Sequence, residues 1–343
     1  MNLNHATPSC TPLDSQPNPT RRRLIAGAGL GLTLGWAQQS HAQSLVPNLR
    51  LLVGFPAGAG LDPVARQIAD LLRGSYASTV IVDNKAGAGG RIALEALKTA
   101  PPDGSSIILT PGSTLFLYPH IYKKLSYDPV NDFSPITTVY NLKMGLVVGP
   151  ACPAKTLAEY ISFVKKDPKN SSYASPSQGS IPHFIGSVFA KASGLDLTHV
   201  PYKGSAPAWL DLLSGQVPAY FTPIGADAIK RHESGEARVL AVADPARTRL
   251  LPQVPTFAEL GFPSVVIQEW VGMYTTGKTP AATVNALNAA IRKTLQSPEV
   301  MQLTARSQTE PIPSTAAALA ALQNTDTERW GGIVKASGFR PED

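Results

Sequence analysis

Residues 49–72 read LRLLVGFPAGAGLDPVARQIADLL, and this segment decides the fold. Its first part, 49–55, is a continuous apolar run typical of a buried strand. After a loop of small residues, Asp62 is placed to cap a helix, and Pro63 suits the first helical position. Apolar side chains then recur at helical spacing, at Val64, Ile68, Leu71 and Leu72. A strand, a glycine-rich loop and an amphipathic helix in this order predict an α/β fold.

The alternation of strands and helices continues along the chain in two blocks. Strands are expected at 79–82 and 106–110 in the first block, and at 144–148, 173–175, 198–200, 219–221 and 239–243 in the second. A last apolar run, 265–274, is predicted as a strand, and the pattern after it is purely helical. We expect those closing helices to pack on the first block.

The chain would then cross between the blocks twice, near 144–149 and near 265–272. Two crossings predict two doubly wound, mainly parallel α/β lobes joined by a two-segment hinge, with a cleft between them. The predicted division of the chain is 43–146 for the first part of lobe 1, 147–267 for lobe 2, and 268–343 for the second part of lobe 1.

Residues 1–42 have the features of an export signal. Three arginines, Arg21 to Arg23, precede the apolar run 24–37, and the small residues Ser40 and Ala42 suit a signal peptidase. The run is too short for a membrane span and too rich in glycine for a stable helix. We therefore predict a periplasmic protein cleaved after Ala42, exported by either the twin-arginine or the general secretory route.

Composition excludes several classes of protein. Charged residues make up 16% of the 343 residues, and a mild, evenly spread net charge of +6 argues against a nucleic-acid partner. The 28 glycines and 31 prolines have no period, so a collagen or low-complexity tract does not fit. Once the signal is removed, Cys152 is the single cysteine, expected as a buried small hydrophobe.

The chain also lacks several motifs of active and cofactor sites. The loop at 58–63 has no third glycine of the dinucleotide fingerprint, and no P-loop lysine motif or G-x-S-x-G elbow is present. The histidines after the signal show no zinc-binding spacing: His120, His183, His199 and His232. We therefore expect no catalytic residues, no metal and no cofactor, in a protein that is not an enzyme.

Three loops of small residues, 55–62, 84–90 and 175–180, each come directly before a predicted helix. A helix start has unpaired N–H groups and a partial positive charge, and glycine lets a ligand approach the backbone. Each loop alone is better explained by a tight turn. Because the three loops are divided between two lobes, they predict an anion site in the cleft.

Several short motifs follow one another in a specific order. They are Phe55-Pro56-Ala57-Gly58, Asp62-x-x-Ala65-Arg66, Asn84-x-x-Gly87-Ala88-Gly89-Gly90, Pro102-Asp103-Gly104, Gly179-Ser180-x-x-His183, Pro201-Tyr202-Lys203-Gly204 and Trp270-x-Gly272. With these motifs the chain resembles the Bug family of solute-binding proteins, the extracytoplasmic receptors of tripartite tricarboxylate transporters. The resemblance implies a type II periplasmic-binding fold, a Venus flytrap that closes on a small carboxylate. It also implies integral-membrane transporter subunits as partners of a monomeric receptor.

The resemblance also implies the ligand contacts. In lobe 1 they are Phe55, Ala57, Gly58, Ala59, Asp62, Gly87, Ala88 and Ser113, and in lobe 2 they are Ser175, Gly179, Ser180 and His183. Tyr202 is a further candidate, which packing would explain equally well.

The chain departs from the family pattern at three positions. Leu61 stands where Ser or Thr is common, Lys85 replaces the usual arginine, and Thr222 stands where many members have aspartate. Loss of that acid argues against an amino-acid ligand, so we expect a mono- or dicarboxylate, aromatic ones included. Two alternatives stay open: a periplasmic sensing subunit for a signalling partner, and an exported hydrolase.

Overall fold

The computed structural model describes residues 46–58, 61–306, 309 and 311–340, all within one compact unit of the chain. The predicted export signal, residues 1–42, and the predicted contact Ala59 lie outside the described residues. In the described ranges no helix has the combination of length and apolarity that a membrane crossing requires.

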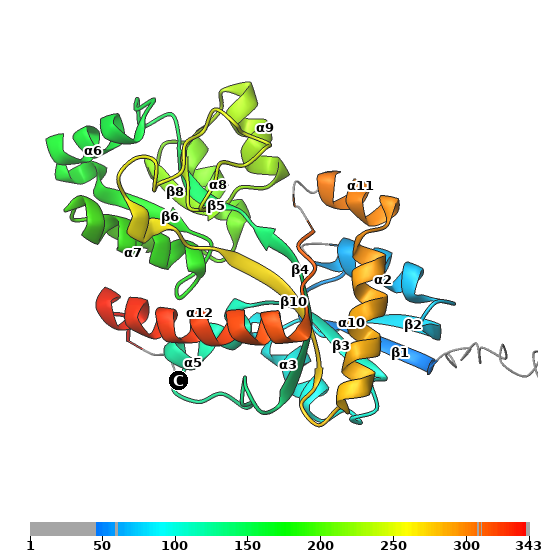
Figure 1. Ribbon diagram of the computed structural model, residues 1–343. Helices are drawn as coiled ribbons and strands as arrows, with labels where there is room; N and C mark the ends of the chain where they lie inside the picture. The colour runs from blue at the N-terminus through cyan, green and yellow to red at the C-terminus, as the bar shows by residue number, and fades with distance from the viewer. Residues whose placement is uncertain (1–45, 59–60, 307–308, 310, 341–343) are drawn as a thin grey trace, which may run out of the picture. The chain divides into compact units, whose positions relative to one another are not determined.

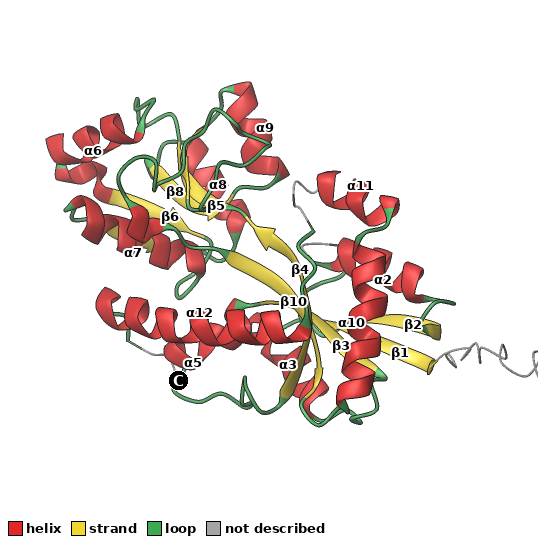
Figure 2. Cartoon of the chain, viewed as in Figure 1, coloured by secondary structure: helices red, strands yellow, loops and turns green. Residues whose placement is uncertain are grey.

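Two five-stranded sheets form the framework, with helices on both faces of each (Figures 1 and 2). The first sheet has the order β2 (Ala77–Asn84), β1 (Val46–Val53), β3 (Ser106–Pro111), β10 (Glu269–Thr276) and β4 (Phe133–Leu142). The second has the order β7 (Thr198–Pro201), β6 (Ser172–Ser175), β8 (Ala219–Pro223), β5 (Met144–Val148) and β9 (Arg238–Val242). Each strand predicted for 79–82, 106–110 and the second block is present.

The helices divide between the faces of the two sheets. On one face of the first sheet lie α2 (Asp62–Leu72), α10 (Ala281–Leu295) and α11 (Pro298–Arg306). On its other face lie α3 (Arg91–Lys98), α4 (Ser113–Phe116), α5 (Tyr118–Ile121) and α12 (Ala316–Ser337). The second sheet is covered by α6 (Leu157–Lys166) and α7 (Ile181–Ser193) on one face, and by α8 (Ser205–Leu213) and α9 (Ala226–Ser234) on the other. Three short helices complete the set: η1 (Ala88–Gly90), η2 (Pro168–Ser171) and η3 (Pro263–Val265).

The sheets are mixed, whereas the sequence predicted mainly parallel ones. Both strands that follow a crossing run against their neighbours: β5 is antiparallel to β8 and β9, and β10 to β3 and β4. As a result β1 to β4 all end at one edge of the first sheet, and β6 to β9 all end at one edge of the second. Lys143 alone joins β4 to β5, so these two edges face each other across the crossings.

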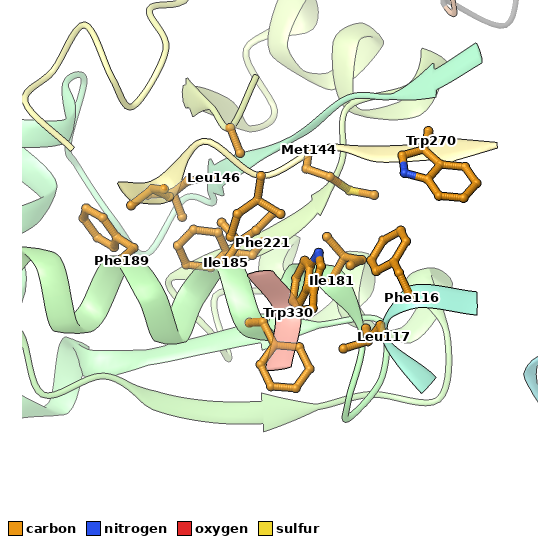
Figure 3. Packing of buried hydrophobic residues seen from close by; sticks show 14 of the residues in the cluster. Phe116, Leu117, Met144, Leu146, Ile181, Ile185, Phe189, Phe221, Trp270 and Trp330 are labelled. Carbon is orange, nitrogen blue, oxygen red and sulfur yellow. The ribbon is translucent and has the colours of Figure 1, made fainter. Parts of the chain in front are cut away.

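Alternating side chains explain the layers. Leu51 and Val53 of β1 pack with α2 and α10, whereas Leu52 between them packs with α3 and α4 on the other face. The cluster around α4 continues into lobe 2 without a break, as Figure 3 shows. Trp330 of α12 lies 5.8 Å from Phe116 and 5.6 Å from Phe184 of α7, between ring centroids. The closing helices do pack on the first sheet, and α12 also contacts lobe 2.

Two local predictions were wrong. Residues 265–268 form no strand, because this apolar segment is the second crossing, where Val265 and Ile267 are buried in the cluster that the two lobes share. Asp62 does not cap α2, because the helix begins at Asp62 itself and its side chain bonds other groups. At α6 the sequence Thr156-x-x-Glu159 does act as a capping signal: Thr156 caps the helix, and its hydroxyl accepts the Glu159 amide at 3.2 Å.

Candidate functional site

The loops predicted to bind an anion lie where parallel strands end. Residues 54–61 follow β1, residues 85–87 follow β2, and Ser113 lies just beyond β3. In lobe 2, residues 176–180 follow β6, and Tyr202 follows β7. Because all these strands end at the facing edges of the two sheets, the loops of both lobes border the space between them.

Asp62 holds the first loop together. Asp62 is 1% exposed, and its Oδ2 accepts hydrogen bonds from the Gly58 amide at 2.7 Å and from Arg66 Nε at 2.8 Å. Its Oδ1 accepts from Asn84 Nδ2 at 2.9 Å, and the same amide group donates to the Phe55 carbonyl at 3.1 Å. Burial raises the pKa of Asp62, but the hydrogen bonds and the Arg66 charge outweigh burial, so the pKa lies below its ordinary value. The structure therefore places Asp62 as an ionised anchor whose oxygens both accept from protein donors.

The second loop runs through the left-handed region of backbone space. The φ angles are 132° at Gly87, 48° at Ala88, 64° at Gly89 and 93° at Gly90, and Ala88 is the one non-glycine residue with a positive φ in the described chain. The first strand packs tightly against this loop, because a Cβ added to Gly54 would lie 2.6 Å from the Gly90 Cα. This contact fixes the backbone of the second loop. The predicted contacts Gly87 and Ala88 are exposed on it.

Ser113 is already bonded to an acid of the protein. Its backbone N–H donates to Oε1 of Glu269 at 3.0 Å. Glu269 is the first residue of β10, which begins at this edge because it runs antiparallel to β3. Glu269 is 4% exposed, and burial raises its pKa to about 7, with a smaller contribution from Asp326 and against the hydrogen bonds from Ser113.

Ser175 and His199 have the spacing of a nucleophile and its base, with 2.7 Å between Ser175 Oγ and His199 Nε2. The same hydroxyl lies 2.9 Å from the Ser177 carbonyl oxygen, which can only accept. The single hydroxyl proton therefore goes to Ser177, and His199 donates its Nε2–H to Ser175. In this arrangement His199 cannot take a proton from Ser175, which is 0% exposed.

His183 supplies a neutral donor in the first turn of α7. Ser180 caps this helix, since its Oγ accepts the His183 amide at 3.4 Å. The Gly179 N–H donates to His183 Nδ1 at 3.2 Å, so the proton of the neutral ring is on Nε2. The ring stacks on His199 with centroids 3.8 Å apart, and burial lowers the pKa of His183 to about 4. At neutral pH the side chain is therefore an uncharged N–H donor.

The loop before α7 also borders lobe 1. A Cβ on Gly179 would lie 3.3 Å from Ile121 Cδ1 and 3.5 Å from the ring of Phe339, which follows α12. The Phe339 ring centroid is 6.0 Å from that of His183. Gly179 and His183 thus lie where lobe 2 touches the first sheet's helices.

Tyr202 is turned toward its own lobe. Its hydroxyl donates to Asp211 Oδ2 of α8 at 2.8 Å, and burial together with Asp211 raises the pKa of Tyr202 to about 12. Its backbone N–H donates to the Ser175 carbonyl at 3.0 Å. The structure thus gives Tyr202 a role in holding the loops after β6 and β7 together.

Two cavities lie along these edges. One, of about 270 Å³, is largely apolar and is lined by Phe55, Leu61, Val64, Pro111, Tyr140, Leu142 and Thr309. The other, of about 680 Å³, lies at the crossings, where Lys143, Asp244 and Gln268 line it. The larger cavity shares none of the predicted contacts, whereas the smaller one contains Phe55.

A polar cluster joins the two crossings at the larger cavity. Lys143, in the first crossing, donates to Asp244 Oδ1 at 3.0 Å, and Gln268, in the second, donates to the same oxygen at 3.4 Å. Asp244 is 1% exposed, and burial raises its pKa although Lys143 and Gln268 oppose the rise. The cluster therefore couples the two chain segments on which the lobes would turn.

Comparison with known proteins places this geometry in a family. The family model described as the tripartite tricarboxylate transporter family receptor matches residues 64–339. The chain belongs to this family. Protein BugT of Bordetella pertussis is 30% identical to it over 321 residues, which cover 93% of this chain and 98% of BugT.

Solved structures of such receptors have the same fold. Rpa4515 of R. palustris, solved with adipate, is 28% identical, with a TM-score of 0.75 over 86% of this chain and 99% of that one. MatC of Rhodopseudomonas palustris, solved with malate, is 28% identical, with a TM-score of 0.70 over 84% and 99%. The predicted two-lobe, type II periplasmic-binding fold is confirmed, and the family's fold is that of solute-binding receptors.

Several residues at the facing edges of this receptor were not predicted as site residues from the sequence. Glu269 and Gln268 were hidden in the apolar run 265–274, where two polar residues in succession were the available signal. Asn84 was part of a motif, but its bonds to Asp62 and Phe55 join residues more than 20 positions apart in the sequence. No local pattern predicts such contacts.

Proposed function

We propose that this receptor binds a small mono- or dicarboxylate between its lobes and delivers it to integral-membrane subunits of a tripartite tricarboxylate-type transporter. The observation that carries the proposal is the set of loops from both sheets that border the interlobe space. The exposed backbone of Ala57, Gly87 and Ala88 would donate from lobe 1, beside Gly58, whose own N–H is bonded to Asp62. The Nε2–H of His183, with Gly179 and Ser180 beside it, would donate from lobe 2. Only a ligand held by both lobes favours closure.

The ligand would carry an apolar body. Leu61 and Phe55 line the small cavity beside the first loop, and both are apolar, whereas family members commonly have a hydroxyl side chain at the position of Leu61. The related receptors solved with adipate and with malate are consistent with a carboxylate of this size. Backbone and neutral imidazole donors suit an anion without requiring an arginine in direct contact.

The test is direct. Ligand released from the purified protein is identified by mass spectrometry, and a panel of aliphatic and aromatic carboxylates, amino acids and sugars is screened by thermal shift. We expect mono- or dicarboxylates to raise the melting temperature. A protein stabilised by amino acids alone would contradict the proposal.

The hydrolase alternative has one structural observation to consider, the close approach of Ser175 and His199. Because the Ser175 hydroxyl donates to the Ser177 carbonyl, the pair is a buried structural contact, and we therefore favour a receptor. Ester turnover that is abolished by Ser175→Ala would reverse this choice. A sensing role differs only in the partner: transporter subunits captured by the ligand-bound receptor support delivery, and a captured sensor kinase supports signalling.

Export is proposed together with this function, because the solved structures of this fold include the periplasmic binding protein BugD, which is 30% identical to this chain. The proposed mature protein begins at Gln43 and acts as a monomer. Sequencing the N-terminus of the protein recovered from the periplasm tests the cleavage site, and a start well before Gln43 would contradict it.

A further inference from the structure

Glu269 lies at the edge of the first sheet that faces lobe 2. It is the first residue of β10, opposite Leu142 of β4, and Val271 two residues later pairs with Pro111 at the end of β3. The carboxylate therefore extends beyond the last paired residue of β3, where Ser113 begins the next helix. It lies in the row of strand ends that also contains the first two anion-binding loops.

This carboxylate bonds the backbone donor of a predicted ligand contact. The Ser113 N–H donates to Oε1 at 3.0 Å. A ligand carboxylate that approached Ser113 would make the same bond. The side chain of Glu269 thus occupies, with the same chemical group, a place that the proposed function assigns to the ligand.

The charges around Glu269 favour its protonated form. Asp326 of α12 acts on it with a like charge, and Asp326 in turn accepts the Trp270 Nε1–H at 2.8 Å and lies near Arg329. Tyr118 of α5 also interacts with Glu269, and burial raises the pKa of Tyr118, so that its hydroxyl is uncharged. Lys143, which directly follows β4, donates to Asp244. Burial is the larger cause, and together with Asp326 it raises the pKa of Glu269 to about 7.

We propose that Glu269 is a specificity-determining residue of the cleft. Because of Glu269, the cleft admits a ligand carboxylate beside Ser113 only when a proton is bound together with the ligand. This inference rests on the proposed function. In the ionised state Glu269 repels the ligand carboxylate. When Glu269 takes a proton from solvent, its new O–H donates to a ligand oxygen, while its other oxygen still accepts from the Ser113 N–H. Ligand capture therefore consumes one proton above the pKa of the free acid.

The consequence is a defined pH profile. Well above pH 7, where free Glu269 is ionised, the Kd should rise about tenfold for each unit of pH, because one proton is bound with the ligand. Below pH 7 the acid is already protonated, and the Kd should level off. Adipate and malate are suitable probes, because both their carboxyl groups are ionised above about pH 6.5 and so contribute no proton of their own.

The experiment is isothermal titration calorimetry of the whole exported protein with adipate and with malate from pH 6.5 to 8.5. Each titration is made in two buffers with different ionisation heats, so that proton uptake by the wild type is measured without any variant. The key variant is Glu269→Gln, whose amide donates without a proton. The matched control is Glu236→Gln, which removes the same charge from an exposed position of lobe 2.

We expect proton uptake near one at pH 8.5 in the wild type and in the Glu236→Gln control. The Glu269→Gln variant should show a Kd that is flat with pH and at least tenfold lower than the wild-type Kd at pH 8.5. A wild type that binds without proton uptake, or a Glu269→Gln variant with an unchanged pH slope, overturns the role of Glu269 and leaves carboxylate binding intact. If neither probe binds at any pH and the full carboxylate panel is also silent, the proposed function itself is refuted.

Discussion

The imidazole rings of His183 and His199 lie parallel, with centroids 3.8 Å apart and an angle of 9° between their planes. Two imidazolium ions could not share this geometry without strong repulsion. Burial lowers the pKa of His183 to about 4, and burial together with His183 lowers the pKa of His199 to about 3. The stacked pair is therefore neutral across the physiological range, and it holds the loop before α7 in place.

Acid should destabilise the fold through this pair. An unfolded histidine has a pKa near 6.5, so between about pH 6.5 and pH 4 the unfolded chain binds more protons than the folded one. The free energy of unfolding should therefore fall as the pH is lowered through this window, by up to about 1.4 kcal/mol per unit of pH for each ring. Urea unfolding at several pH values measures this slope. A double variant, His183→Gln with His199→Gln, should have a shallower slope, and an equal slope would contradict the assignment.

Asp62→Asn should loosen the first loop. The variant removes the charge that attracts Arg66 and weakens the bond from the Gly58 amide, so we expect a loss of about 1–2 kcal/mol in the free energy of unfolding. Affinity for the carboxylate should fall by about tenfold because the loop is less ordered. Urea unfolding and ligand titration measure the two effects. The control is Asp70→Asn on the same helix, where the acid is mostly exposed and the change should stay within about 0.5 kcal/mol.

Gly54→Ala should disturb the contact between β1 and the second loop. A Cβ at this position would lie 2.6 Å from the Gly90 Cα, and neither backbone can move without shifting a strand or the loop. Overpacking of this kind costs about 1–3 kcal/mol, which a thermal or urea unfolding curve detects. Gly225→Ala is the matched control, because its φ of −105° suits alanine and the added Cβ meets nothing within 4 Å. Equal stability of the two variants would argue against the close approach.

Lys143→Met should destabilise the protein more than the removal of an exposed cation does. The change leaves the carboxylate of Asp244 buried without its cation, at a cost of about 3 kcal/mol. Arg73→Met, which removes a half-exposed partner of Asp70, should cost less than about 1 kcal/mol. In the double variant with Asp244→Leu, most of the stability should return. A double-mutant cycle with no coupling would show that the buried pair does not tie the crossings together.

Local signals in the sequence sufficed for most of the framework. The apolar run before the first loop and the spacing of Val64 and Ile68 were enough to predict β1 and α2, and Thr156 marked the start of α6. The strand predicted at 265–268 is absent, because a buried crossing between two lobes is as apolar as a strand. The directions of β5 and β10 also had no local signal, since they depend on where the chain enters and leaves lobe 2.

The loops at the facing edges could be predicted from the sequence, whereas the hydrogen-bond partners of their residues could not. Glycines before helices indicated which loops border the cleft. The partners of Asp62 and Ser113 follow from tertiary contacts, because Asn84 reaches Asp62 from a neighbouring strand and Glu269 reaches Ser113 from 156 positions away in the sequence. Such bonds decide which polar groups remain available to a ligand, and they appear only once the fold is known.

The apolar cluster that runs from Phe116 through Trp330 to Phe184 has a consequence for how such receptors diversify. Each lobe has its own sheet, yet neither has a complete interior, so residues 144–268 cut out as a fragment would expose the aromatic face of α7 to water. Exchange of whole lobes between relatives would disrupt this shared apolar cluster. New ligand preferences are therefore more readily acquired by changing the short loops after β1 and β2, which lie outside this apolar cluster.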